Sequence, residues 1–216
     1  MRRKVLMIIG LLTLLFACDE EQYQYSCDEE VDVFVKENLE LFETCNLELL
    51  ASYSTEIQRA ALRMNTPERR FELWNEKYET LLLDPSFSEK EQIHIESFMN
   101  QLTVKHFDPE NSELFDELLD FYVKWEGYAL DTLEWDKETL SLIVASLQTE
   151  RNLGMNTKSV STDPMAGSEC SCNTGSDFCN DTQASCVESQ NCRTGQIMGC
   201  GILGMEECDG SCIYGQ

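Results

Sequence analysis

The sequence predicts an all-α helical bundle of about five or six helices, followed by a small, disulfide-rich C-terminal module dominated by loops. Between residues 28 and 150, apolar residues recur at steps of three and four, which places them on one face of a helix. The composition then changes, because eight of the eleven cysteines and seven of the eleven glycines lie within residues 169–216. So short a segment buries too little apolar surface to fold without cross-links.

Capping residues and prolines mark where several of the predicted helices begin. Thr66-Pro67 places an N-cap residue before a proline at the first helical position. Ser88 and Glu91 form a capping box, and Asp108-Pro109 begins a further helix. The predicted helical stretches are, approximately, residues 28–49, 56–64, 66–82, 88–102, 108–125 and 136–147.

Residues 1–17 have the pattern of a signal peptide. Arg2, Arg3 and Lys4 give a positive start, and residues 5–16 form a largely apolar run. A helix that spans a bilayer needs about 20 apolar residues, so this run is too short to span it. We therefore exclude residues 1–17 from the fold and expect the chain to be exported.

Leu15-Phe16-Ala17-Cys18 closes the signal segment and resembles the lipobox of bacterial lipoproteins. In that family the cysteine is acylated and becomes the new N-terminus. The resemblance implies a membrane partner through a lipid anchor on Cys18, with residues 18–27 as a tether. The alternative is an ordinary secreted protein in which Cys18 is incidental.

An acidic run, Asp19-Glu20-Glu21-Gln22, follows directly and resembles the surface-export signal of lipoproteins in the Bacteroidota. It implies the outer membrane or the cell surface. Under enterobacterial sorting, the same aspartate would indicate retention at the inner membrane.

The chain is strongly acidic, with 40 Asp and Glu against 16 Lys and Arg and a formal net charge of −24. Such a polyanion is repelled by nucleic acid and by a bare anionic membrane. We therefore expect no nucleic-acid partner. The carboxylates of the acidic helical domain, residues 28–150, are spread over polar faces, as in ordinary solvated helices.

No group of residues in the helical domain has a catalytic pattern. The two histidines, His94 and His106, are twelve residues apart and lack a metal-binding HExxH context, so we expect them to pack or to lie in a loop. Trp74, Trp125 and Trp135 are the expected anchors of the core. We predict no enzyme, no cofactor and no bound metal.

Apart from Cys18, two cysteines of the exported chain lie outside the module. Cys27 and Cys45 flank the first predicted helix, and a disulfide between them would add about 3 kcal/mol by the loop-entropy argument. Cys45 also lies on the apolar stripe of that helix. A buried free thiol at Cys45 is therefore the alternative.

Residues 151–168 lose the helical periodicity and are rich in Gly, Ser, Thr and Asn, which predicts an exposed linker open to proteases. Cleavage there would release a peptide that begins just before Cys170. Alternatively, the helical domain and the module form one fixed unit, and residues 151–168 are only a connecting loop.

The module's cysteines are expected to form four disulfides, because the export signal indicates an oxidising compartment. Cys170 and Cys172 are too close to pair with each other, and the connectivity otherwise stays open. A zinc site would favour CxxC pairs, and the module has none. The eight cysteines are Cys170, Cys172, Cys179, Cys186, Cys192, Cys200, Cys208 and Cys212.

The module opens with Cys170-Ser171-Cys172, has Cys179 six residues further on, and carries an aromatic residue, Tyr214, near its end. This resembles fulvocin C, a myxobacterial bacteriocin with eight cysteines. The chain as a whole resembles the bacteriocin fulvocin C-related proteins, in which a helical region precedes such a module. The resemblance implies antibacterial activity in residues 169–216 and no enzymatic activity.

The module itself carries seven acidic residues against one arginine, so no bulk charge attracts it to a target membrane. A toxic module would therefore use a receptor or envelope component of the target cell, or its one apolar stretch. The alternative for that stretch is the module's own core. A non-toxic surface protein that binds a protein or a glycan is the rival function. The candidate contact residues are Ile197, Met198, Ile202, Leu203 and Met205.

Replacing Cys18 by serine tests the lipid anchor. Cys18→Ser removes the thiol that would accept the acyl chains, so the protein should leave the membrane fraction and lose its normal processing. Membrane fractionation and gel mobility measure both effects. A Cys18→Ser protein that still fractionates with membranes and migrates unchanged would contradict the anchor.

Overall fold

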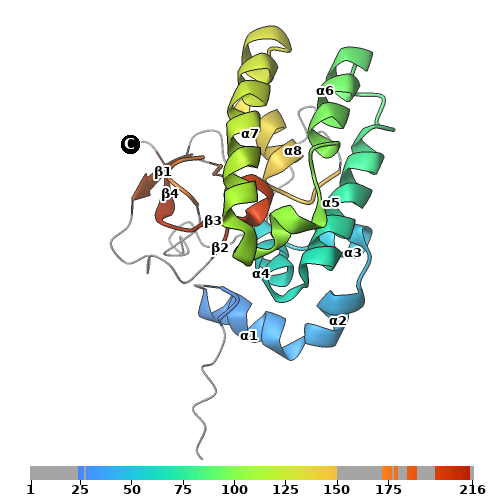
Figure 1. The fold of residues 1–216 in the computed structure, drawn as a ribbon. Helices are drawn as coiled ribbons and strands as arrows, with labels where there is room; N and C mark the ends of the chain where they lie inside the picture. The colour runs from blue at the N-terminus through green and yellow to red at the C-terminus, as the bar shows by residue number, and fades with distance from the viewer. Residues whose placement is uncertain are drawn as a thin grey trace, which may run out of the picture.

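The computed structural model describes residues 24–26, 28–149, 172–176, 178–179, 184–188 and 198–214. Within these residues, eight α-helices precede four short strands (Figure 1). The predicted order, a mostly helical region followed by a disulfide-bonded segment, is confirmed. The signal segment, Cys18, Cys27 and the predicted linker lie outside the described residues.

The first predicted helix is three helices: α1 (Glu29–Glu37), α2 (Leu39–Thr44) and α3 (Leu47–Ala51). Asparagine side chains cause both breaks, because they bond to the backbone and so compete with helix continuation. The Asn38 side chain donates to the Phe34 carbonyl at 2.8 Å. Asn46 accepts from the Leu49 amide at 3.0 Å and caps α3. The helix count is therefore larger than predicted.

The next three helices correspond to the stretches predicted at about residues 56–64, 66–82 and 88–102. They are α4 (Thr55–Met64), α5 (Pro67–Leu81) and α6 (Glu89–Met99). Thr66 caps α5 ahead of the proline, and the capping box between Ser88 and Glu91 is confirmed.

Two 3-10 turns, η2 (Val104–Phe107) and η3 (Pro109–Asn111), precede the longest helix, α7 (Ser112–Thr132). The last helix, α8 (Lys137–Val144), is capped by Asp136, which accepts from the Thr139 amide at 2.8 Å. In the described part of the chain, no helix has both the length and the apolar character that a membrane span requires.

The three tryptophans are buried in the helical core, as predicted. His94 stacks on Trp125, with ring centroids 4.5 Å apart, and its Nε2 lies 3.0 Å from the Trp125 carbonyl oxygen. The Trp125 indole in turn donates to the His94 carbonyl at 2.8 Å. Burial lowers the pKa of the His94 imidazole, so this histidine is a packing residue.

Lys77 is fully buried, which the sequence did not predict. Its ammonium group donates to three backbone carbonyls at the end of α8: Leu142 at 2.5 Å, Ile143 at 2.7 Å and Ser146 at 2.6 Å. The nitrogen also lies 4.5 Å from the centre of the Trp74 ring. Burial lowers the pKa of Lys77 well below its usual value. The three carbonyls and the negative end of the helix dipole counteract that cost.

The strands form two small antiparallel pairs in the cysteine-rich module (Figure 1). In the first pair, Cys186 lies directly opposite Cys212. Next to this pair, Cys172 forms an isolated antiparallel β-bridge with Gly210. The second pair flanks a 3-10 turn, η4. The strands are β1 (Ala184–Glu188), β2 (Met198–Cys200), β3 (Glu206–Glu207) and β4 (Gly210–Tyr214), and η4 is Ile202–Gly204.

Substituting Lys77 tests its role at the end of α8. Lys77→Met keeps most of the volume but removes the ammonium donor from three buried carbonyls, of which Ile143 keeps another donor, the Tyr78 hydroxyl. We therefore expect a loss of about 3 kcal/mol or more in the free energy of unfolding. Urea unfolding followed by circular dichroism measures it. Lys124, exposed on α7, is the matched control, and Lys124→Met should change stability by less than about 0.5 kcal/mol. Equal effects from the two variants would contradict this role.

Candidate functional site

The cysteine-rich module is the candidate site, and three disulfides hold its described part together. They join Cys172 to Cys186, Cys179 to Cys212, and Cys200 to Cys208. Six of the eight predicted cysteines are thus paired. The other two, Cys170 and Cys192, lie outside the described residues.

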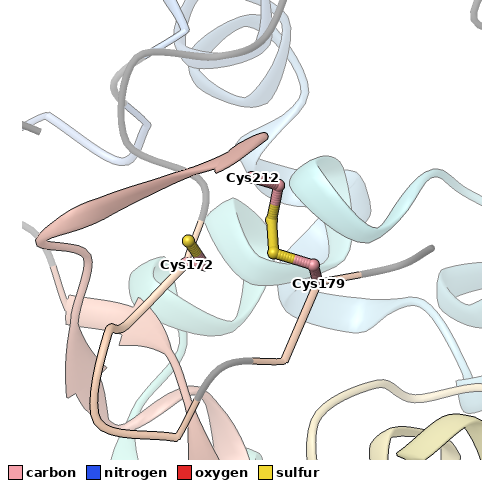
Figure 2. Close-up of side chains that lie close together, drawn as sticks. All are labelled: Cys172, Cys179 and Cys212. Carbon is pink, nitrogen blue, oxygen red and sulfur yellow. A yellow bond between two sulfur atoms is a disulfide. The ribbon is translucent and has the colours of Figure 1, made fainter. Parts of the chain in front are cut away.

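Two of these disulfides lie side by side next to the β1–β4 pair. The sulfur atoms of Cys172, Cys179 and Cys212 all lie within 4.8 Å of one another (Figure 2). Cys172 and Cys179 are buried and form, with Ala184, a small hydrophobic cluster of the module's own. This cluster is made largely of sulfur, which explains why the segment needs its cross-links.

Three residues of the module's apolar stretch are buried in the structure. Ile202, Leu203 and Met205 are only 2%, 1% and 4% exposed, and they belong to the same hydrophobic cluster as the helices. Phe178 enters that cluster too. The core they enter is shared with the helices, which differs from the alternative of a core made by the module alone. Of the other two candidates, Ile197 and the side chain of Met198 lie outside the described residues.

Arginines from α4 and α5 complete the contact between the helices and the module. Arg63 places one guanidinium nitrogen 3.5 Å from the Cys208 sulfur and donates through another to the Tyr25 carbonyl. The guanidinium group occupies the space where a side chain on Gly199 would lie, and Gly199 has a φ of +128°. Arg70 lies 3.6 Å from the Met205 sulfur. The helical region and the module therefore share apolar and polar contacts.

A half-buried carboxylate shapes the turn that enters the helical core. Glu206 accepts from the Ile202 amide at 2.8 Å. Gly201 is required there, because its φ is +66° and a Cβ would collide with the Glu206 carboxylate. Burial raises the pKa of Glu206. Burial also raises the pKa of Tyr122 on α7, and the nearby charges of Glu126 and Glu206 add to that shift.

Cys45 is a free, buried thiol in the structure. It lies between α2 and α3 in extended backbone, and its sulfur points toward the core, 3.8 Å from the Phe42 carbonyl oxygen. Burial raises the pKa of the thiol, which keeps it protonated and unreactive. This differs from the predicted disulfide with Cys27, a residue outside the described part of the chain, and agrees with the alternative.

Substitution of a module residue should destabilise the helices if the core is shared. All three tryptophans lie in the helical region, so tryptophan fluorescence reports on that region alone. Ile202→Ala should lower the free energy of unfolding in this signal by about 2–4 kcal/mol, because it leaves a cavity in the common core.

The matched control is Ile213→Ala, in the same module but 53% exposed, which should cost less than about 0.5 kcal/mol. If Ile202→Ala left the tryptophan transition in place, the module and the helices would be independent folding units.

Comparison with known proteins assigns no family to the chain. No family model, no curated protein and no solved structure matches it. The resemblance to the fulvocin C-related proteins therefore rests on the residues of the sequence, chiefly those of the module.

Proposed function

We propose that the chain is an exported lipoprotein, anchored through Cys18 at the bacterial outer membrane or cell surface, with a fulvocin C-like antibacterial module at residues 169–216. The signal segment and the lipobox-like residues support the export and the anchor. The eight cysteines, six of them paired in the described residues, support the module. Its target is a receptor or envelope component of another cell.

The observation that decides how such a module acts is the burial of Ile202, Leu203 and Met205 in the helical core. These side chains cannot enter a membrane or a receptor while the module stays docked. The attached module is therefore latent, or it acts through the surface it leaves exposed. A cut between residues 151 and 168 would not suffice to free it, because the packing against the helices would remain.

The exposed apolar surface of the docked module is the outer face of the β1–β4 pair. Val187 and Ile213 are 46% and 53% exposed. Ser185 lies opposite Ile213 and Val187 opposite Ser211, so the two apolar residues share one face as diagonal neighbours. We assign contact with the target to this face, in place of residues 197–205.

A non-toxic surface interaction protein is the second candidate. The shared core favours it, because a diffusible toxin gains nothing from a module built into its carrier. On this reading the same β1–β4 face binds a protein or a glycan on a neighbouring cell.

Growth inhibition of related bacteria by the purified, oxidised full chain separates the two candidates. The test compares the intact chain with a chain cut between residues 151 and 168. A module that acts through its exposed surface should inhibit growth in at least one of these forms. No inhibition by either would refute antibacterial action by the docked module and favour the interaction protein.

Two variants locate the active surface. Replacing both Val187 and Ile213 by serine should abolish inhibition, because it removes the exposed apolar pair. Leu83→Ser, at an 84% exposed position in the helical region, is the control and should inhibit normally.

The cut chain should also elute from gel filtration with its module still bound. A module that separates at once would show that the docking is weak.

A further inference from the structure

We propose that Cys172, Cys179, Cys186 and Cys212 form a tetrathiolate site for Zn²⁺ when their two disulfides are reduced. The inference goes beyond the proposed function and does not rest on it. Two disulfides, Cys172–Cys186 and Cys179–Cys212, lie next to each other, and the sulfur atoms of Cys172, Cys179 and Cys212 gather in one place (Figure 2).

The spacing of the sulfur atoms is close to what zinc requires. Tetrahedral zinc–thiolate bonds of about 2.3 Å place the sulfurs about 3.8 Å apart. The sulfurs of Cys172, Cys179 and Cys212 already lie within 4.8 Å of one another. The fourth, that of Cys186, is bonded to the sulfur of Cys172. Once the disulfides are reduced, the side chains would rotate to bring the four sulfurs into a tetrahedron.

Backbone contacts hold Cys172, Cys186 and Cys212 near one another without the disulfides. The amide of Cys172 donates to the Gly210 carbonyl at 3.2 Å, and its carbonyl accepts from the Gly210 amide at 3.0 Å. Cys186 and Cys212 are direct partners in the β1–β4 pair. These three cysteines therefore stay near one another after reduction.

The fourth cysteine is held by packing against the helices. Cys179 directly follows Phe178, which is buried in the hydrophobic cluster that the module shares with the helical region. This contact anchors the segment independently of the bond to Cys212. The site is thus pre-assembled by the fold, which reduces the entropy lost on metal binding.

The chemistry is a four-electron reduction followed by metal binding. Two equivalents of a two-electron reductant, a dithiol or a phosphine, supply the four electrons, and four protons complete the four thiols. Zn²⁺ then displaces the thiol protons, so its affinity rises with pH. The pair Cys200–Cys208 offers only two sulfurs, and the Arg63 guanidinium beside Cys208 opposes a cation there.

Cobalt binding to the reduced full chain tests the site, because Co²⁺ occupies zinc sites and absorbs visible light. The chain is reduced with a phosphine under anaerobic conditions and titrated with Co²⁺. We expect one Co²⁺ per chain, with the thiolate-to-cobalt charge-transfer band and the visible bands of tetrahedral coordination, and displacement by Zn²⁺. The oxidised chain should give neither band.

Variants identify the ligands. Cys172→Ser and Cys186→Ser should each lose the charge-transfer band or bind Co²⁺ at least about tenfold more weakly. Two double variants, Cys200→Ser with Cys208→Ser and Cys170→Ser with Cys192→Ser, are the controls and should bind as the parent does. Circular dichroism checks that the helices persist in every variant.

Three results would each overturn the proposal. They are the absence of a charge-transfer band in the reduced parent chain, a band that Cys172→Ser and Cys186→Ser leave unchanged, and a band that is lost in either control.

Discussion

The fold depends on a lysine that has no access to water. Transferring an ammonium group into a protein interior costs several kcal/mol, and the group is tolerated only while its hydrogen bonds are complete. Lys77 satisfies all three of its donors on carbonyls at the end of α8, above the face of Trp74. Any shift of α8 would leave the buried ammonium group of Lys77 without its hydrogen-bond acceptors. The position of the last helix, and of the core residues Ile143 and Leu147, is therefore fixed by α5.

That fixed helical frame also supports the module. A segment of this size ordinarily relies on disulfides. Here two of the described disulfides hold the small sulfur-lined cluster, and the third, Cys200–Cys208, closes the loop that contains η4. The rest of its stability comes from elsewhere, because Phe178, Ile202, Leu203 and Met205 bury their apolar surface among the helices. The module thus combines two means of stabilisation. Its covalent part shapes the β1–β4 pair, and its non-covalent part joins the turn at η4 to the larger core.

Short sequence patterns correctly predicted the features that depend on residues close together in the chain. Thr66, Ser88 and Glu91 marked helix starts correctly, and the tryptophans marked the core. Contacts between distant residues gave no such signal. Lys77 resembles any lysine on a solvated helix face until α8 packs against it, 65 residues away. For the apolar stretch around Met205, the sequence left both target contact and a core of the module alone open. It gave no sign of the contact with Arg70, which lies 135 residues earlier.

Arg63 joins the two ends of the described chain, since it contacts both the Tyr25 carbonyl and the Cys208 sulfur. Tyr25 is the seventh residue after Cys18, and seven extended residues reach at most about 25 Å. In a chain anchored through Cys18, the start of α1 and the part of the module beside Arg63 would consequently both stay close to the lipid headgroups. Such a protein would have a short reach. Whatever it recognises would have to come to the surface of the cell that displays it, as happens between touching neighbours.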